Sequence, residues 1–465
     1  MRIASMQVTR VTSISKNLTC IYFSGQYQFY IEKEPKMKVT DYFGKPVLDI
    51  ERASHVGIYS SSDFDTIAVV SSIIRDVIES KDSALIEYTK KFDKYDLTPK
   101  NIQVSKEELK AAYSRLDRSL IAALEHAHKN ITKFHTEQYN TIKRSWETET
   151  EAGVLISERT IPLESVGAYI PGGRATYPST VLMTCTPAKV AGVKRVVVTS
   201  PPPISDAILA ACLICQVGEV YRIGGAQAIA ALAAGTQSVK RVDKIVGPGN
   251  KYVNTAKLSV YGMVDIDMPA GPSEIMIIAD WEADPKMVAS DLLAQAEHDP
   301  DARCVLITES KDLEIEIRKE IEVQKAHLTR VSIIQKSLEK NFLVCRTKSV
   351  DESVAVANML APEHLEIITE NADLIAEKIK NAGTVFVGKY SPVSAGDYAS
   401  GSNHVLPTGM AARFSSSLGV RDYLKSFTTQ RITKQGLLSL KKTIETLASA
   451  ESLDAHAQSV RKRFE

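Results

Sequence analysis

A ten-residue stretch, DLLAQAEHDP, carries an amide and an imidazole at a spacing that could bind a ligand. Gln295 and His298 stand three residues apart on a predicted helix, and side chains at that separation lie on one helix face. Asp284 can cap this helix, and Pro285 fits its first turn, where a missing N–H costs nothing. The Asp-Pro pair after His298 predicts the end of the helix. Taken alone, the pattern is more typical of an amphipathic helix that ends in solvent.

A second candidate lies in APEHLEIIT, where a carboxylate stands beside an imidazole. Glu363 and His364 fall at an irregular junction between a predicted helix and a predicted strand. Adjacent side chains diverge on a regular strand but can face one pocket at such a junction. The two groups differ in pKa and could serve as two proton-transfer groups. An exposed loop without a chemical role is the alternative.

Two later segments add further titratable groups. The long loop SAGDYASGSNHVLPT contains Asp397 and His404, and loops of this length are usually functional or disordered. The tail segment ASAESLDAH contains Glu451 and His456, which cannot share one face of a continuous helix, so a helix break near Glu451 is expected if both are used. A nitrogen and oxygen ligand set without thiolate suits zinc, with manganese or cobalt as alternatives. Spacing alone does not join the four candidate ligands: Gln295, His298, Asp397 and His456.

Glycine-rich turns predict a site for an anionic ligand. YIPGG (169–173), GGAQ (224–227) and GPGN (247–250) each fall between a predicted strand and a predicted helix. Ligands of open parallel sheets lie outside the carboxyl ends of the strands, and backbone N–H groups at a helix start bind anions. The turns therefore fit a dinucleotide or a phosphorylated ligand, although no G-x-G-x-x-G follows any strand.

A rigid turn, MPAGPSE, places a hydroxyl and a carboxyl group together. Its two prolines and its glycine hold Ser273 and Glu274 in a fixed conformation. No G-x-S-x-G motif is present, so Ser273 is expected to form hydrogen bonds and not to act as a nucleophile.

Length and composition exclude several classes of protein. The 465 residues suggest two to four globular domains, and the net charge of +1 gives no general attraction to nucleic acid or to an anionic membrane. No apolar run approaches the ~20 residues of a membrane span. Cys212 and Cys215 lie in an apolar helical pattern, which favours buried thiols in a reduced, cytoplasmic setting. Residues 1–31 lack Asp and Glu, so an organellar transit peptide is the alternative.

The surrounding pattern is that of an α/β protein. Residues 62–80 and 105–146 are predicted to be helical from the spacing of their apolar residues. Four strand–turn–helix units follow from about residue 160, and a second series begins at EIMIIAD. Such alternation predicts parallel sheets flanked by helices. Beyond 415 the sequence indicates no further strand and reads as helical to its end.

Together these segments resemble histidinol dehydrogenases. The resemblance runs in order through VGAYIPGG, STVLMTCTPAKVAG, GGAQAIAAL, VDKIVGPGN, IDMPAGPSE, ASDLLAQAEH, PEHLEI, SAGDYASGSNHVLPT, SSLG and TIETLASAE, over roughly 60–465. It implies two Rossmann-like, incomplete parallel-sheet α/β domains with helical N- and C-terminal extensions. The expected parts are an extension outside the fold (1–36), a small N-terminal segment (37–60), a first α/β domain (61–168 plus 275–418), a second on the NAD side (169–274) and a C-terminal dimerisation segment (419–465).

The resemblance also implies an activity, the last steps of histidine biosynthesis: oxidation of L-histidinol to L-histidine through L-histidinal, with two NAD⁺ and one zinc ion per active site. It assigns zinc to Gln295, His298, Asp397 and His456. It assigns acid–base catalysis to Glu363 and His364. Contacts to substrate fall to Ser273, Gln295, His298, His364, Asp397, His404, Glu451 and His456, and contacts to NAD to Tyr169, Gln227 and Asn250.

The resemblance further implies a homodimer whose C-terminal segment reaches into the active site of the partner. Two other functions stay open at this point. A zinc hydrolase on the same scaffold would use Glu363 to activate water and would not need NAD⁺. A non-catalytic binding protein would be marked by missing ligands, and none of the expected residues is missing.

Overall fold

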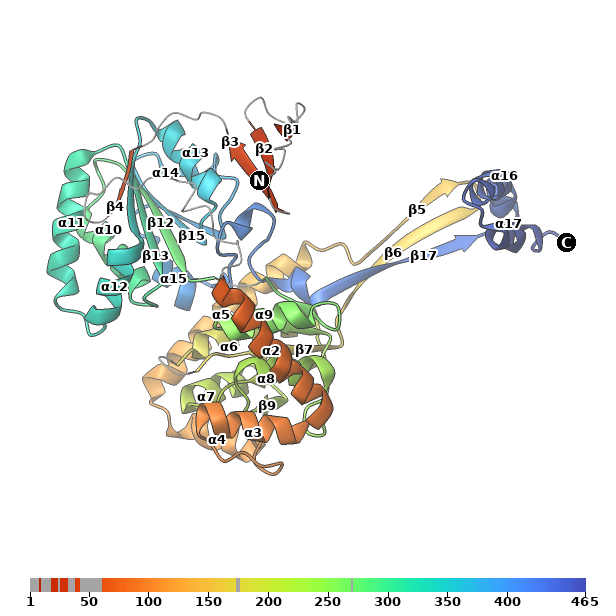
Figure 1. Ribbon diagram of the computed structural model, residues 1–465, viewed down its shortest axis with the longest axis horizontal. Coiled ribbons are helices and arrows are strands. Elements are labelled where there is room, and N and C mark those ends of the chain that lie inside the picture. The colour runs from red at the N-terminus through yellow and green to blue at the C-terminus, as the bar shows by residue number, and fades with distance from the viewer. Residues whose placement is uncertain are drawn as a thin grey trace, which may run out of the picture.

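The computed structural model describes residues 61–172, 176–268 and 271–465, and the backbone of four short strands before them. Two α/β units form the body of the molecule, and a long arm that ends in two helices projects from it (Figure 1). The strands β1 (Val8–Thr9), β2 (Leu18–Phe23) and β3 (Gln26–Ile31) form a separate antiparallel sheet. The proposed role of residues 1–36 as an extension otherwise lies outside the described residues.

The first α/β unit in chain order corresponds to the domain expected on the NAD side. It is built on a five-stranded parallel sheet of order β11-β10-β7-β8-β9. Its strands are β7 (Ser165–Tyr169), β8 (Arg195–Thr199), β9 (Glu219–Tyr221), β10 (Lys244–Val246) and β11 (Asp265–Ile266). Its connecting helices are α6 (Pro178–Ala191), α7 (Asp206–Ile214), α8 (Gly225–Ala234) and α9 (Lys251–Val260). The order reverses at β7, so the crevice between the carboxyl ends of β7 and β10 is a switch point of the kind where ligands bind.

The second unit repeats this order, as β16-β15-β12-β13-β14, and adds β4 antiparallel at one edge. Its strands are β4 (Lys38–Asp41), β12 (Glu274–Ala279), β13 (Arg303–Thr308), β14 (Phe342–Arg346), β15 (His364–Ile368) and β16 (Thr384–Val387). Its helices are α10 (Pro285–Ala296), α11 (Lys311–Lys325), α12 (Val331–Asn341), α13 (Val350–Leu360), α14 (Ala372–Ala376) and α15 (Val393–Tyr398). The predicted start of α10 is confirmed, since the Asp284 carboxylate accepts from the N–H of Lys286 and Pro285 is the first helical residue.

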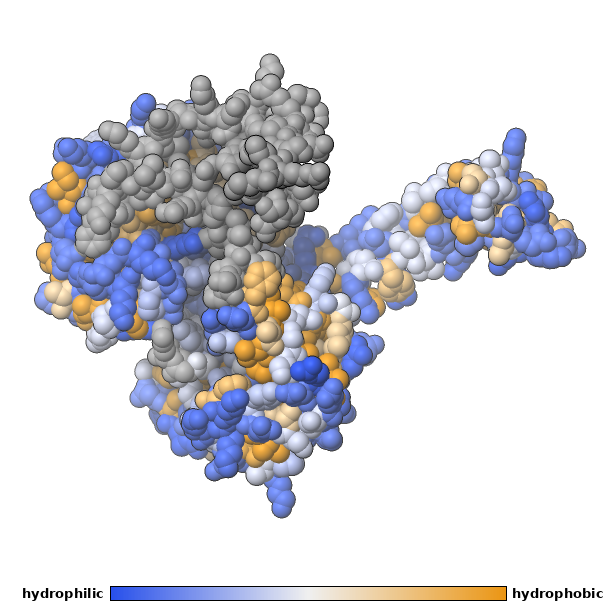
Figure 2. Space-filling model, viewed as in Figure 1, coloured by the Kyte–Doolittle hydropathy of each residue, from blue (hydrophilic) through white to orange (hydrophobic). Residues whose placement is uncertain are grey.

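The projecting arm is an antiparallel sheet of order β17-β6-β5 that carries two helices at its tip (Figure 1). Its elements are β5 (Ser145–Glu151), β6 (Val154–Pro162), β17 (Leu424–Ile432), α16 (Lys434–Ala450) and α17 (Asp454–Arg461), and β17 follows the short 3₁₀ turns η1 (Ala411–Arg413) and η2 (Val420–Tyr423). Apolar and polar residues are interspersed along the arm in Figure 2.

The prediction that no strand follows residue 415 is therefore wrong. The sequence of β17, LKSFTTQRI, is mostly polar, and eight of its nine residues are exposed, so it lacks the apolar alternation that marks a half-buried strand. Its pairing partner β6 is also remote in sequence, with Leu424 opposite Pro162.

The N-terminal helices pack on the first unit. They are α2 (Ser61–Ser80), α3 (Asp82–Asp93), α4 (Lys106–Arg115) and α5 (Arg118–Asn140). Val70, Ile73 and Val77 of α2 share an apolar cluster with Ile229 and Val253 of the first unit. The expected grouping of 61–168 with 275–418 thus differs from the packing, because sequence order does not show which apolar faces meet.

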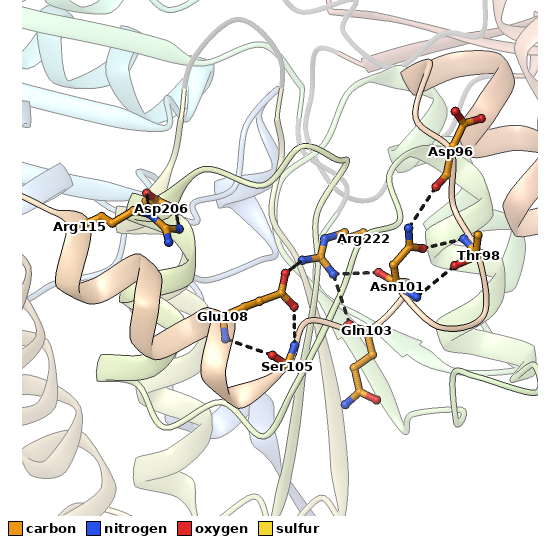
Figure 3. A network of polar contacts seen from close by, with 9 residues as sticks. All are labelled: Asp96, Thr98, Asn101, Gln103, Ser105, Glu108, Arg115, Asp206 and Arg222. Atoms are coloured by element: carbon orange, nitrogen blue, oxygen red, sulfur yellow. Dashed lines mark hydrogen bonds and ion pairs between the residues drawn. The ribbon is translucent and has the colours of Figure 1, made fainter.

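A network of polar contacts joins α4 to the edge of the first sheet at β9 (Figure 3). Ser105 and Glu108 form a reciprocal capping box at the start of α4. Arg222, just after β9, pairs with Glu108 and donates to the carbonyl of Asn101 at 2.8 Å. The guanidinium thus joins α4 to the sheet edge. Arg115, the last residue of α4, and Asp206, the first residue of α7, form a second ion pair, which lies at the surface.

Residues 105–146 do not form one helix as predicted. Leu116 has extended backbone geometry, and the Asp117 carboxylate accepts from the N–H of Ser119 to start α5 as a separate helix. The strand β5 begins at Ser145, within the range expected to be helical. The prediction for 62–80 is confirmed by α2.

Two inferences from composition can be compared with the described part of the chain. None of the described helices is both long and apolar enough to cross a bilayer. Cys212 and Cys215 are buried, and burial raises the pKa of the Cys215 thiol to about 12. Both therefore act as core side chains, as the apolar pattern predicted.

A buried ion pair fixes the GPGN turn of the first unit. Lys257 of α9 and Asp267, which follows β11, pair with both side chains shielded from solvent. Lys257 Nζ donates to the carbonyl of Gly247 at 3.0 Å, and Asp267 Oδ2 accepts from the N–H of Gly247 at 2.6 Å. Gly247 has φ +111°, and a Cβ there would lie 2.2 Å from the carbonyl oxygen of Tyr169, so only glycine fits.

Replacing Lys257 with methionine keeps the aliphatic stem but leaves the Asp267 carboxylate buried without its cation. Removal of one partner from a buried pair costs about 3–5 kcal/mol, so we expect Lys257→Met to lower the free energy of unfolding by about that amount. Urea denaturation followed by circular dichroism measures the change. Lys251→Met, on the same helix but exposed, should stay within about 0.5 kcal/mol of the wild type. Equal stability of the two variants would contradict a structural role for the pair.

Candidate active site

The candidate acid–base pair lies at the amino ends of two neighbouring strands. Glu363 immediately precedes β15, His364 is its first residue, and both side chains are buried. Glu274, the first residue of β12, contacts both through its backbone. Its N–H donates to Glu363 Oε2 at 2.7 Å, and its carbonyl lies 2.9 Å from His364 Nδ1. The irregular junction predicted from the sequence thus does turn both side chains toward one place, with His364 Nδ1 3.6 Å from Glu363 Oε2.

These contacts define the protonation of His364. A backbone carbonyl can only accept, so Nδ1 carries the hydrogen and Nε2 keeps its lone pair. Burial is the main cause that lowers the pKa of His364 to about 4, so the ring is neutral near pH 7. His364 Nε2 is buried, has no hydrogen-bond partner among the described residues, and lies 3.9 Å from Asp397 Oδ1. The histidine is therefore a base with an open acceptor.

Glu363 is shifted in the opposite direction. Burial raises its pKa well above the usual value, and the nearby carboxyl groups of Glu274 and Asp397 raise it further. A carboxyl group of raised pKa is a stronger base when ionised and can hold a proton when neutral. Two neighbouring groups with pKa values moved apart by their surroundings are a common arrangement for acid–base chemistry.

The proposed metal ligands of this chain surround the same place. Gln295 is buried in the last turn of α10, and its Nε2 has no partner within the described part of the chain. His298 lies in the turn just after α10, not on the helix as predicted, and its N–H donates to the carbonyl of Gln295 at 3.2 Å. Asp397 of α15 is largely buried, and burial raises its pKa to about 7.

His404 links this cluster to the first α/β unit. Its Nδ1 lies 3.1 Å from the carbonyl of Asp397, and its Nε2 lies 3.3 Å from Thr180 Oγ1 at the start of α6. Burial lowers the pKa of His404 to about 4, and the nearby His298 lowers it further. The site therefore lies where the two units meet, with a neutral imidazole at the boundary.

Within one chain, the site provides only three of the four expected zinc ligands. The unpartnered amide of Gln295, the imidazole of His298 and the carboxylate of Asp397 are suitable nitrogen and oxygen ligands. No three His, Cys, Asp or Glu side chains in the described ranges form a metal-binding group. This agrees with the geometry, because only two of the three ligands here belong to those types and a fourth must come from elsewhere.

The tail residues are not brought to this site. Glu451 follows α16 and His456 lies in α17, and both residues are exposed. These two helices lie at the tip of the arm, remote from the second unit (Figure 1). The expected break near Glu451 is confirmed: Glu451 ends α16, and Ser452 has φ +59°. The arm is a paired sheet along its length, so it holds the tip away from the body of its own chain.

The expected NAD residues lie at the carboxyl edge of the first sheet. Tyr169 ends β7, its hydroxyl accepts from the N–H of Gly225 at 3.2 Å, and burial raises its pKa to about 12. Gln227 in the first turn of α8 is buried, and its Oε1 has no partner in the region described. Asn250 caps α9, where its side-chain oxygen accepts from two backbone N–H groups.

Ser273 lies beside the candidate acid–base pair, immediately before Glu274, and is partly buried. Its carbonyl accepts from the N–H of Arg303 at 2.9 Å, which fixes the turn to the second sheet. The sequence reasoning named Glu274 but gave it no part in the site, and it did not single out Thr180. The rigid turn around Glu274 was a usable signal, whereas a threonine in an apolar helix gave none.

Comparison with known proteins identifies the family. The histidinol dehydrogenase family model matches residues 59–464. A histidinol dehydrogenase of Methanothermobacter thermautotrophicus is 44% identical over 432 residues, 92% of this chain and 99% of that protein. One from Methanosarcina mazei is 49% identical over 399 residues, 85% of this chain and 91% of that protein. A crystal structure of histidinol dehydrogenase from Elizabethkingia anophelis superposes with a TM-score of 0.83 at 38% identity, covering 93% of this chain and 99% of that one. The chain belongs to the histidinol dehydrogenase family of oxidoreductases.

Proposed function

We propose that this protein oxidises L-histidinol to L-histidine through L-histidinal, with two NAD⁺ and one zinc ion for each active site. The observation that supports this best is the pair Glu363 and His364. Both side chains are hydrogen-bonded to the backbone of Glu274, and His364 Nε2 lies 3.9 Å from Asp397 Oδ1. The pair provides a neutral imidazole base and a carboxyl group of raised pKa in one pocket. Two successive oxidations need both groups.

In the first oxidation the substrate's C–H bond breaks and its hydride goes to NAD⁺, while the alcohol proton goes to His364 Nε2. The Nδ1–H bond to the Glu274 carbonyl holds the ring in the required tautomer. In the second, Glu363 takes a proton from water as the water oxygen bonds to the aldehyde carbon, and protonated His364 returns its proton to the carbonyl oxygen, which gives the diol. When the diol loses its C–H hydride to the second NAD⁺, His364 Nε2 takes the proton of one hydroxyl group, which leaves the carboxylic acid. Glu363 and His364 are both buried, and exclusion of bulk water around them would retain the reactive aldehyde.

Gln295, His298 and Asp397 of one subunit and His456 of the other would hold the zinc. When bound, zinc would orient the substrate through its imidazole and amine groups. Ser273 and His404 would contact the substrate, and Glu451 would join them from the partner. Tyr169, Gln227 and Asn250 would bind NAD at the carboxyl edge of the first sheet, where the order reverses.

The arm supports a site shared in a homodimer. It exposes large apolar side chains, among them Phe427, Leu438 and Leu447, with 43%, 49% and 59% of their surface accessible. A series of such residues on a projecting element is typical of a surface covered in an assembly. An exchange of identical arms between two copies suits two-fold symmetry. Each arm would then place its Glu451 and His456 in the site of the other copy.

The overall function and its metal can be tested together. Zinc-loaded protein should form NADH when L-histidinol is added and should stop when a chelator removes the metal. His298→Asn should remain folded but bind zinc poorly, since one imidazole ligand is lost. Metal analysis and circular dichroism measure both properties. Full zinc occupancy in that variant would contradict the ligand assignment. Failure to form NADH from L-histidinol, together with zinc-dependent cleavage of an amide substrate without NAD⁺, would indicate the hydrolase.

The two catalytic roles can be separated at Glu363. Glu363→Gln keeps an acceptor for the N–H of Glu274 but cannot take a proton, so it should still form NADH from histidinol and be slow on histidinal. One general base is typically worth ~10²–10⁴ in rate, so the two half-reactions should differ clearly. Single-turnover kinetics with each substrate measures them. Equal impairment of both would show that the division of roles is wrong.

The shared site can be tested by mixing two inactive variants. His298→Ala and His456→Ala proteins, unfolded and refolded together, should regain about a quarter of wild-type activity. Random mixing makes about half the dimers hybrids, and each hybrid has one site with both lesions and one intact site, by the two-fold symmetry. A tag on one parent shows that hybrids form. Hybrids without activity would mean that each site is built within one chain.

A further inference from the structure

One helix of the first unit lacks a donor within its own backbone. Pro187 lies in the interior of α6, and proline has no backbone N–H. In a regular helix the N–H of residue 187 would donate to the carbonyl of Met183, four residues earlier. Residues 180–188 of α6 are all buried. The Met183 carbonyl therefore needs a donor from another part of the protein.

The donor comes from the long loop that follows α15. The side-chain amide of Asn403 donates to the Met183 carbonyl at 2.7 Å, and its oxygen accepts from the N–H of Val405 at 2.9 Å. Asn403 is only 4% exposed, so the nitrogen and the oxygen of a buried amide each have a partner. The hydroxyl of Tyr423 donates to the next carbonyl of α6, that of Thr184, at 2.7 Å. Side chains from the C-terminal part of the chain thus serve the carbonyls near the proline.

The residue after Asn403 is His404, which contacts both α/β units. His404 Nε2 lies 3.3 Å from Thr180 Oγ1 of the first unit, and its Nδ1 lies 3.1 Å from the carbonyl of Asp397 of the second. Thr180 and Met183 stand three residues apart on α6, so they lie on one face of the helix. Asn403 therefore holds the loop on the same helix face that His404 contacts.

We infer that Pro187 and Asn403 form a latch between the two α/β units, and that Asn403 is a positioning residue for His404. The proline leaves one carbonyl of α6 without its helical donor, and Asn403 binds that carbonyl and no other, which fixes the loop at one position along the helix. The inference rests on the proposed function, which places NAD on the first unit and the acid–base pair on the second. Reacting atoms must approach to about 3–3.5 Å, so a displaced loop would slow hydride transfer.

The latch itself can be tested without substrate. Asn403→Ala leaves the buried Met183 carbonyl without a donor, so it should lower the unfolding temperature by about 2–4 °C. In the Pro187→Ala background, residue 187 has an N–H that can donate to Met183, so the same change should lower it by about half as much or less. Thermal unfolding followed by circular dichroism measures the four proteins of this cycle. Asn140→Ala, which changes an exposed asparagine at the end of α5, is the matched control.

The positioning role requires a measurement of hydride transfer. Single-turnover formation of NADH from histidinol should slow by about 10–100-fold in Asn403→Ala. Adding Pro187→Ala should not restore this rate, because it satisfies the carbonyl without holding the loop. Pro187→Ala alone keeps the Asn403 bond, since a carbonyl oxygen accepts two hydrogen bonds, and should stay within about threefold of the wild type. If Asn403→Ala does not fold at the assay temperature, the double variant is used in its place.

Zinc affinity separates a displaced loop from a damaged metal site. The zinc ligands of this chain belong to the second unit and keep their own supports, so zinc affinity should stay within about threefold in every variant. Competition with a chelating dye measures it. A loss of zinc affinity that matches the loss of rate would place the effect at the metal and overturn the positioning role.

The other outcomes separate the latch from the proposed function. If Asn403→Ala has no effect on unfolding, or the same effect in both backgrounds, Asn403 is not the needed donor and the latch is wrong. If the double variant regains both stability and the wild-type rate, Asn403 supports the fold and positions nothing. If the wild type forms no NADH from histidinol, the proposed function and the positioning role fall together, while the stability cycle still decides the latch.

Discussion

The hydrogen bonds between the backbone of Glu274 and the side chains of Glu363 and His364 are the constraint on which the site depends. They exist because β12 and β15 are adjacent and begin at the same level, with Ile275 opposite His364. The carbonyl selects the tautomer of His364, and the N–H orients the carboxyl group of Glu363. Burial of both groups then moves their pKa values in opposite directions. Sheet register thus determines the acid–base chemistry that the pocket can perform.

Several polar groups are buried together in the site, and their protonation states reduce the free-energy cost of this burial. A buried charge is expensive unless paired, whereas a neutral imidazole or a protonated carboxyl group with hydrogen bonds is not. His364 and His404 are kept neutral, and Glu363 and Glu366 have raised pKa values. With both imidazoles neutral, some donors and acceptors remain unused among the described residues, such as His364 Nε2 and the amide of Gln295. Those free groups are what a metal or a polar substrate can engage.

Much of the fold and of the site was predictable from the sequence. Apolar strands alternating with helices predicted both sheets, and the Asp284 cap predicted the start of α10. The adjacent Glu363 and His364 could be recognised as a pair, but the backbone of Glu274 that orients them depends on pairing between strands about 90 residues apart. The strand β17 was missed because its residues are polar and its partner β6 is remote. Sequence patterns report burial within an element, and these features depend on contacts between elements.

Hydride transfer requires the two α/β units to be held at a defined separation, because reacting atoms must approach to about 3–3.5 Å. The expected NAD residues belong to the first unit and the acid–base pair to the second. The segment 399–408 spans them: the side chain of Asn403 donates to the carbonyl of Met183 at 2.7 Å, and His404 contacts Thr180. Both contacts reach α6, whose start follows β7 and therefore the switch point of the first sheet. The long loop, whose length predicted either function or disorder, thus connects the two units, and in the proposed function it would set the distance between cofactor and base.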